Sequence, residues 1–164
     1  MDVLWAPWRM AYVGGAAPPR GCLFCAALDA DARERLLLGR TAHSLVMLNR
    51  YPYASGHLMV APRRHTADLP ALPDVEHADL AETLRRSLAV VMETLRAQGA
   101  NLGMNLGTPG GAGVVDHLHW HVVPRWTGDT NFMTTIADAR VMPQHLLDTY
   151  DRLRPAFAWL DGGS

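Results

Sequence analysis

Two short apolar runs in the first half of the chain predict the first strands of the fold. Residues 44–48 (Ser-Leu-Val-Met-Leu) and 57–60 (His-Leu-Met-Val) are separated by the loop-like stretch Tyr-Pro-Tyr-Ala-Ser-Gly. Short apolar runs bounded by turn-forming residues are typical of buried strands. The pattern therefore predicts two antiparallel neighbours joined by a loop.

A longer stretch, residues 77–98, repeats apolar positions at the spacing of a helix. Charged residues such as Glu82, Arg86 and Glu93 occupy the other side. This distribution predicts an amphipathic helix that covers one face of a sheet, and Gly99 is expected to end it. The apolar stripe consists of Leu80, Leu84, Leu88, Val91 and Leu95.

The second half of the chain adds further expected elements. They are a strand at 101–106, a glycine-rich loop at 107–113, a strand at 114–123 and a final helix at 143–153. Hairpin-type connections dominate this order and only one long helix is present. The pattern therefore favours an α+β fold with a largely antiparallel sheet over a parallel, doubly wound one.

The length of the chain limits the number of domains. With 164 residues, of which 49% are apolar, the chain suffices for one compact core but not for two. Residues 14–20, Gly-Gly-Ala-Ala-Pro-Pro-Arg, are typical of a hinge. We expect residues 1–20 to form an arm with Trp5, Trp8 and Tyr12, and residues 21–164 to form a single domain.

The charge balance excludes some classes of partner. Charged residues make up 19% of the chain and the formal net charge is −1, so no strong field attracts nucleic acid or a membrane surface. No stretch approaches the ~18 apolar residues of a membrane-spanning helix, and Pro7 and Arg9 interrupt the first residues. The two cysteines, Cys22 and Cys25, are too few for a disulfide framework, which fits a reducing compartment. We expect a cytoplasmic protein.

Three histidines alternate with bulky apolar residues near the end of the second half. On a strand, His117, His119 and His121 project from one face at intervals of about 6.6 Å. Three imidazoles are costly to bury without partners. The residues leave three interpretations open: histidines without chemistry, a zinc site, or phosphoryl or nucleotidyl transfer in which one imidazole attacks phosphorus.

The glycine-rich loop before these histidines helps to choose among the interpretations. Its glycines, Gly107, Gly110, Gly111 and Gly113, permit backbone conformations that turn several amides toward one anion. Beside a row of histidines, such a loop favours a phosphate ligand over a bare metal-bound water.

The stretch from His117 to Val123, His-Leu-His-Trp-His-Val-Val, fits the pattern His-φ-His-φ-His-φ-φ, in which φ is an apolar residue. The chain thereby resembles the histidine triad (HIT) family. The resemblance extends over most of the chain, and its arm and residues 128–132 resemble a bacterial branch of diadenosine tetraphosphate phosphorylases and hydrolases. Further matching motifs are Cys22-Leu-Phe-Cys25, Leu48-Asn49-Arg50, Gly56-His57-Leu-Met-Val-Ala-Pro62, Arg64-His65, Asn105 and Pro124-Arg125.

The resemblance implies a fold and a set of roles. The fold is a mostly antiparallel five-stranded sheet with one long helix and a shorter C-terminal helix. His119 is the nucleophile on the α-phosphorus, His121 and His57 contact phosphate oxygens, and Asn49 binds a ribose hydroxyl. Leu48 lines an apolar slot for the base, although core packing is an equally good account of it. The remaining nucleotide-binding residues are Asn105, Gly111 and Gly113.

Four residues are candidates for a metal site. Cys22 and Cys25 have ligand spacing, and His65 and His117 complete the set by resemblance to zinc-containing family members. Such a zinc site is structural. The alternative is a pair of reduced cysteines in a hydrophobic turn beside an untethered His65. No redox cofactor is expected.

Several functions stay open at this point. The leading hypothesis is a nucleotidyl hydrolase or transferase that cleaves dinucleoside polyphosphates by hydrolysis or phosphorolysis. The alternatives are cleavage of another adenylated metabolite such as an adenosine phosphoramidate, a zinc metallohydrolase, and a non-catalytic adenine-nucleotide sensor. A homodimer is implied by the resemblance.

Overall fold

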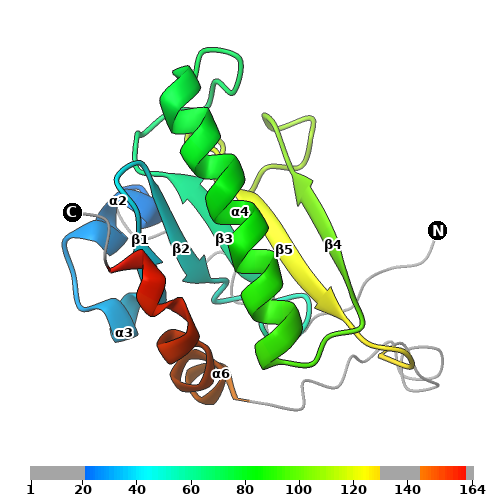
Figure 1. The fold of residues 1–164 in the computed structure, drawn as a ribbon. Helices are drawn as coiled ribbons and strands as arrows, with labels where there is room; N and C mark the ends of the chain where they lie inside the picture. Colours follow the sequence, from blue (N-terminus) through cyan, green and yellow to red (C-terminus); the bar gives the residue numbers. More distant parts are fainter. Residues whose placement is uncertain (1–20, 130–144, 162–164) are drawn as a thin grey trace.

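The computed structural model describes residues 21–129 and 145–161 of the chain. A five-stranded sheet carries one long helix across one face, as Figure 1 shows. The expected arm at residues 1–20 lies outside the described residues, so its role and the extent of the single domain stay predictions. The helices are α2 (Leu23–Leu28), α3 (Ala32–Arg35), α4 (Asp74–Thr94), α6 (Leu146–Leu153) and the 3₁₀ segment η2 (Arg154–Leu160). The strands are β1 (Leu37–Arg40), β2 (Ser44–Leu48), β3 (Leu58–Pro62), β4 (Gly99–Met104) and β5 (Trp120–Arg125).

The sheet has the order β1-β2-β3-β5-β4, and every pair of neighbours is antiparallel. This confirms the α+β fold class with an antiparallel five-stranded sheet, one long helix and a C-terminal helix. The expected hairpin is β2 with β3, which pair in register from Ser44 with Pro62 to Leu48 with Leu58. The pattern of the sequence missed β1, because a four-residue strand that contains Gly39 is too short to show an alternation.

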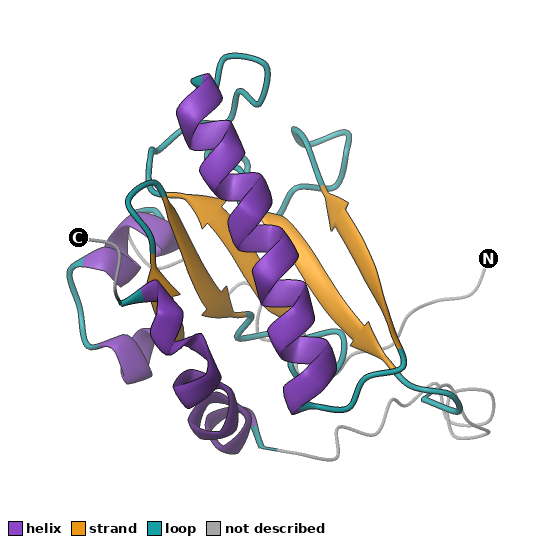
Figure 2. Ribbon diagram, viewed as in Figure 1, coloured by secondary structure: helices purple, strands orange, loops and turns teal. Residues whose placement is uncertain are grey.

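The long helix α4 lies across the sheet (Figure 2), and the residues of the expected stripe belong to the apolar cluster there or pack against it. Leu80 and Val91 are fully buried there. The end of the helix differs from the expectation: α4 stops at Thr94, and Gly99 begins β4. The left-handed residue that turns the chain is Arg96, with φ 52°. Glycine is therefore not the residue that ends this helix.

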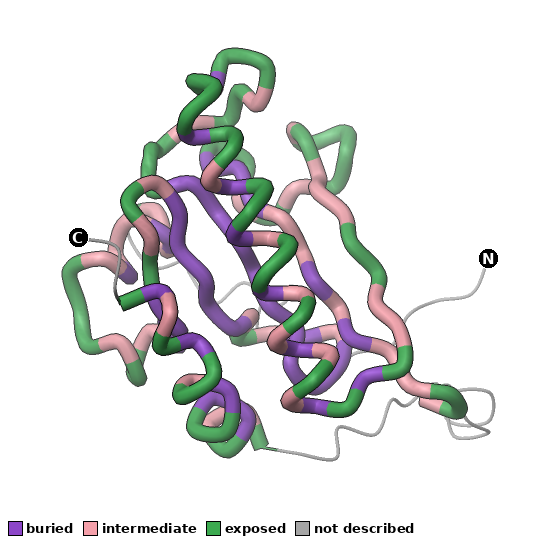
Figure 3. The backbone as a smooth tube through the Cα atoms, in the orientation of Figure 1, coloured by how far each residue is buried: buried purple, intermediate pink, exposed green. Residues whose placement is uncertain are grey.

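Two apolar clusters lie on opposite faces of the sheet. The cluster under α4 includes Val46, Leu58 and Val122, whereas the cluster on the other face joins Phe24 of α2 to Met59 of β3. Alternate residues of a strand point to opposite faces, so β2 and β3 contribute to both clusters. Figure 3 shows that these two central strands are buried along their whole length.

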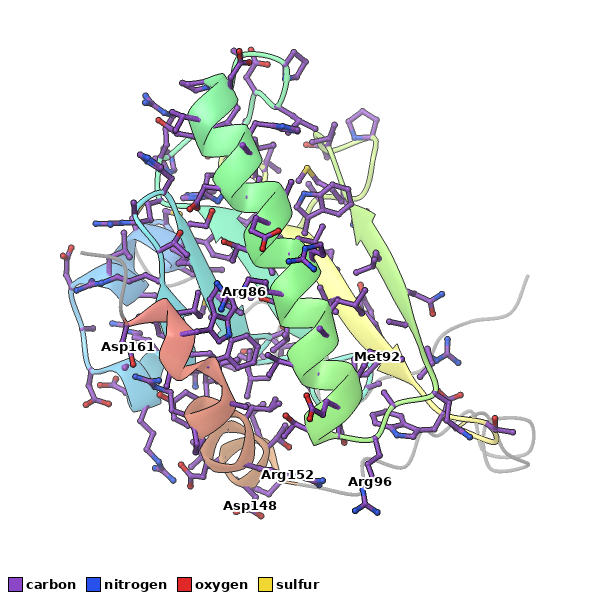
Figure 4. All side chains as sticks on the ribbon, viewed as in Figure 1. Arg86, Met92, Arg96, Asp148, Arg152 and Asp161 are labelled. Carbon is purple, nitrogen blue, oxygen red and sulfur yellow. The ribbon has the colours of Figure 1, made fainter. Side chains whose placement is uncertain are left out.

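The C-terminal segment, α6 with η2, packs beside α4. Arg152 of α6 donates a hydrogen bond to the carbonyl of Thr94 (2.7 Å), which satisfies an acceptor in the last turn of α4. Figure 4 shows Arg86 extending from α4 toward this segment, where its guanidinium lies 3.7 Å from the ring centroid of Trp159. The expected final helix is thus present from Leu146 onward, and its predicted start at residues 143–144 lies outside the described residues.

The sequence predicts a strand at 114–123, but the observed strand β5 is shorter and lies later in the chain, from Trp120 to Arg125. Just before it, the backbone N–H of Leu118 donates to the carbonyl of Thr66 in the loop after β3 (2.7 Å). Strand β3 pairs with β5 only from Leu58 to Val60. Residues 114–119 therefore form a loop that crosses the end of β3.

None of the helices in the described part of the chain is both long and apolar enough to pass through a membrane.

Candidate functional site

One of the three triad histidines lies on a strand and the other two lie in a loop. His121 lies on β5 opposite Met59, and its side chain therefore points to the face of the sheet that carries α2. His117 and His119 lie in the loop before this strand. The expected single row of imidazoles on one strand is thus wrong, because β5 begins only at Trp120 and the N–H of Leu118 bonds to Thr66 beyond the end of β3.

His119 is held by its own loop. Its side chain is 4% exposed, and its Nδ1 lies 2.9 Å from the carbonyl oxygen of His117. A carbonyl only accepts, so Nδ1 carries the proton and Nε2 carries the lone pair. Burial lowers the pKa of His119, and the hydrogen bond to His117 opposes this shift. The arrangement presents a neutral imidazole with a nucleophilic Nε2.

His57 and His121 are joined by a direct hydrogen bond between their rings. The Nε2 of His57 lies 2.9 Å from the Nδ1 of His121, and the backbone N–H of Tyr53 donates to the Nδ1 of His57 (3.1 Å). His57 is fully buried, and the Tyr53 ring stacks on it at 5.0 Å. Because its Nδ1 accepts, a neutral His57 carries its proton on Nε2 and donates it to His121. The proton of a neutral His121 then lies on Nε2.

The residues expected to bind ribose and base lie at the end of β2. Asn49 is half-buried, and its Oδ1 accepts the backbone N–H of Tyr51 (2.8 Å), which is the geometry of an Asx turn. Leu48 is 1% exposed and packs in the cluster under α4. Turn formation and core packing account for both residues, and their contacts with a nucleotide stay predictions.

The glycine-rich loop closes on itself. The N–H of Gly111 donates to the carbonyl of Thr108 (3.0 Å), and the carbonyl of Gly111 accepts from Nδ2 of Asn105 (3.2 Å). Asn105 and Gly111 are thus brought together, while Gly113 is exposed beside them. Since the Gly111 amide is already used inside the loop, binding of a phosphate by Gly111 or Gly113 stays a prediction.

The four expected metal ligands converge in space. Cys22 is the N-cap of α2 and Cys25 lies within this helix, whereas His65 follows β3 and His117 precedes β5. Their ligand atoms nevertheless all lie within 4.8 Å of one another. Among the described residues this is the one group of its kind. His117 turns toward the cysteines, so the three triad histidines do not form a shared metal site there.

The distances from the Nδ1 of His117 to the other three ligand atoms are close to the edges of a tetrahedral zinc site. The Nδ1 of His117 lies 3.2 Å from Sγ of Cys22 and 3.8 Å from Sγ of Cys25, and it lies 3.3 Å from Nδ1 of His65. Zinc–ligand bonds of ordinary length require edges of about 3.6 Å between sulfur and nitrogen and about 3.3 Å between two nitrogens. The donor set, two thiols and two imidazoles, is one that zinc prefers.

The surroundings of His117 also suit a metal ligand. Its Nε2 donates to the carbonyl of Pro62 (2.8 Å), which leaves the lone pair on the Nδ1 that faces the cysteines. Burial lowers the pKa of His117 and so favours the neutral form that binds metals. In the metal-free chain, burial raises the pKa of Cys25, followed by the effect of the neighbouring Cys22. A bound cation would reverse this tendency and favour the thiolates.

Two residues of the site were not singled out in the sequence. Phe24 is fully buried, and its ring contacts those of His117 and His119. Tyr53 supplies the backbone donor to His57. The position of Phe24 between two candidate ligands was a usable signal for the first, whereas a backbone donor carries no signature in the sequence.

Comparisons with known proteins agree with this arrangement. The family model described as the HIT domain matches residues 32–128, more than half of the chain. A protein from Mycobacterium tuberculosis named AP-4-A phosphorylase is 40% identical over 154 residues, covering 89% of this chain and 79% of that protein.

Solved structures show the same fold. A zinc-bound histidine triad family protein from Mycobacterium smegmatis has a TM-score of 0.66 and 32% identity, covering 88% of this chain and 98% of that one. A hypothetical histidine triad nucleotide-binding protein from Sulfolobus tokodaii has a TM-score of 0.67 and 24% identity, covering 85% of this chain and 94% of that one. The second likeness concerns the fold alone.

Proposed function

The chain belongs to the histidine triad (HIT) family, and on that premise we propose that it cleaves diadenosine polyphosphates through a nucleotidyl-histidine intermediate on His119. The observation that carries the proposal is the buried His119 ring, whose Nδ1 is committed to the His117 carbonyl. This contact leaves Nε2 as the nucleophile. The 40% identity to a protein named AP-4-A phosphorylase supports diadenosine tetraphosphate as the substrate and phosphate as the acceptor.

In the first step, Nε2 of His119 attacks the α-phosphorus of diadenosine tetraphosphate. A nitrogen–phosphorus bond forms, the bond from phosphorus to the bridging oxygen breaks, and ATP departs. The leaving oxygen belongs to a phosphate that is stable as an anion, so it requires little proton donation. In the second step, inorganic phosphate attacks the same phosphorus, His119 leaves, and ADP forms.

His121 and His57 complete the proposed machinery at different distances from the phosphorus. The Nε2–H of His121 is a donor for an oxygen of the α-phosphate, where negative charge increases during attack. His57 is fully buried, and both of its ring nitrogens engage protein atoms. These contacts support a positioning role for His57 through His121 instead of a direct contact with phosphate.

The cysteine–histidine cluster supports a structural zinc site in this protein. Cys22, Cys25, His65 and His117 would hold the ion, and the zinc-bound relative from Mycobacterium smegmatis supports the identity of the metal. Zinc would supply a cross-link between α2 and the loops that follow β3 and precede β5. Four side chains would complete the coordination of such an ion, so it would have no position for a reacting water.

A homodimer completes the proposal. Strand β4 forms one edge of the sheet, and Leu102 on this strand is 46% exposed. An exposed strand edge with an apolar side chain is a common site of self-association. Light scattering coupled to size-exclusion chromatography measures the mass in solution, and a monomer at micromolar concentration contradicts the dimer.

The test of the reaction uses diadenosine tetraphosphate with and without inorganic phosphate, and the products are identified by mass. ADP and ATP that appear only with phosphate support phosphorolysis. AMP and ATP in the absence of phosphate indicate hydrolysis by the same intermediate. Absence of turnover under both conditions contradicts the proposed substrate, and adenosine phosphoramidate is then the next compound to assay.

A further inference from the structure

Phe24 lies beside the nucleophile but belongs to the segment that carries the cysteines. We propose that Phe24 is a positioning residue that holds the His119 ring in its reactive orientation and couples this orientation to the metal-binding segment. The proposal rests on the function proposed above for His119. It assigns a catalytic consequence to a side chain that has no polar atom.

The contacts of the His119 ring define its freedom to move. The centroid of the Phe24 ring lies 5.0 Å from that of His119, with an interplanar angle of 37°. The centroid of the His121 ring lies 4.8 Å from that of His119, with an interplanar angle of 78°. The hydrogen bond from Nδ1 to the His117 carbonyl restrains one edge of the imidazole. The ring moves by rotation about the Cα–Cβ and Cβ–Cγ bonds, and the aromatic neighbours restrict these rotations in addition to the hydrogen bond.

Phe24 itself is held tightly. It is 0% exposed and packs in the cluster with Met47, Met59 and Ala61 on the face of the sheet opposite α4. The centroid of its ring also lies 4.9 Å from that of His117, with an interplanar angle of 41°. One side chain therefore contacts both a candidate metal ligand and the nucleophile.

The helix that carries Phe24 has little stability of its own. Helix α2 has six residues, and its N-cap makes no side-chain hydrogen bond. Helices of this length are not stable without tertiary contacts. Cys22 and Cys25 stand on either side of Phe24, and their contacts with His117 and His65 fasten α2 to the loops. These contacts of the two cysteines and the apolar cluster around Phe24 together hold its ring in place.

The test replaces the ring while keeping most of the volume. Phe24→Leu is compared with Phe157→Leu, because Phe157 is equally buried but belongs to the cluster under α4. For each variant, kcat and KM for diadenosine tetraphosphate, bound zinc and the melting temperature are measured. Long-range ¹H–¹⁵N correlation spectra of the nucleotide-free protein report which nitrogen of His119 carries the proton.

We expect Phe24→Leu to lower kcat by between about tenfold and a hundredfold, the size of effect caused by a misplaced reacting group. KM changes by less than about twofold, because ground-state binding is retained. The spectrum of His119 changes from a single Nδ1–H tautomer to a mixture, while zinc content is unchanged. Phe157→Leu lowers the melting temperature comparably but leaves kcat, KM and the tautomer as in the wild type.

The proposal is overturned if His119 keeps a single tautomer in Phe24→Leu, or if kcat falls no further than in Phe157→Leu. If the Phe24→Leu variant does not fold, the same measurements are made on Phe24→Met. Wild-type protein without turnover contradicts the proposed function instead, and in that case the comparison of tautomers still decides whether Phe24 positions His119.

Discussion

The Nε2 atom of His57 lies 2.9 Å from the Nδ1 atom of His121 in the interior of the site. The backbone N–H of Tyr53 donates to the opposite nitrogen of His57, so the direction of the hydrogen bond between the two rings is determined by the main chain. The backbone at Tyr53 thus sets which nitrogen of His121 can donate a proton.

This direction is measurable in solution. At a pH where the imidazoles are neutral, we expect His57 and His121 to carry their protons on Nε2 and His119 to carry its proton on Nδ1. Long-range ¹H–¹⁵N correlation spectra distinguish these tautomers, with assignments from His57→Gln and His121→Gln. A proton on Nδ1 of His57 would contradict the direction of the bond.

Replacement of His119, the proposed nucleophile, separates nucleotide binding from the chemical step. His119→Asn is expected to lower turnover by at least about a thousandfold, because no other described group can form the covalent intermediate at that position. Its affinity for the nucleotide changes only a few-fold, as calorimetry can measure. The matched control is His77→Asn, an exposed histidine on α4, which keeps wild-type turnover. Equal turnover in the two variants would exclude His119 as the nucleophile.

Removal of one cluster ligand tests the metal site. Protein purified without a histidine tag should contain about one zinc ion per chain, and His65→Asn should lose most of it. At metal concentrations of 100 to 1,000 times Kd, loss of binding costs roughly 3–4 kcal/mol of the free energy of unfolding. Mass spectrometry of the metal content and thermal unfolding measure the two effects. The exposed His77→Asn variant serves again as the control. Wild-type protein that contains no zinc, and whose melting temperature does not change on addition of a chelator, would contradict the zinc site.

Gly56, directly before His57, adopts a backbone conformation that disfavours other residues. Gly56 adopts φ +79°, and a Cβ atom there would overlap the side chain of Leu95. We expect Gly56→Ala to lower the free energy of unfolding by about 2–4 kcal/mol through backbone strain and overpacking. In Gly99→Ala, whose Cβ meets nothing within 4 Å, the change stays within about 0.5 kcal/mol. Chemical denaturation measures both, and a neutral Gly56→Ala would show that this turn tolerates a side chain.

Local patterns of the sequence predicted the parts of the fold that depend on neighbouring residues. The stripe from Leu80 to Leu95 indicated α4, and two apolar runs with a turn between them indicated β2 and β3. A spaced motif, Cys22 with Cys25, indicated metal ligands, and the family resemblance supplied His65 and His117 as their partners. The structure brings all four together.

The sequence by itself determined the inventory of this protein: an antiparallel α+β fold, a histidine triad that places it in the HIT family, and a pair of cysteines with the spacing of metal ligands. Only the tertiary structure decided that His119 lies in a loop, that the His57 ring bonds to that of His121 and that Phe24 contacts the His119 ring. The reason is physical. Alternation along a chain reports local geometry, but the bond from Leu118 to Thr66 and that from His117 to Pro62 join residues far apart in sequence. Those long-range bonds involve the residues just before Trp120, and β5 therefore begins only after the first two histidines.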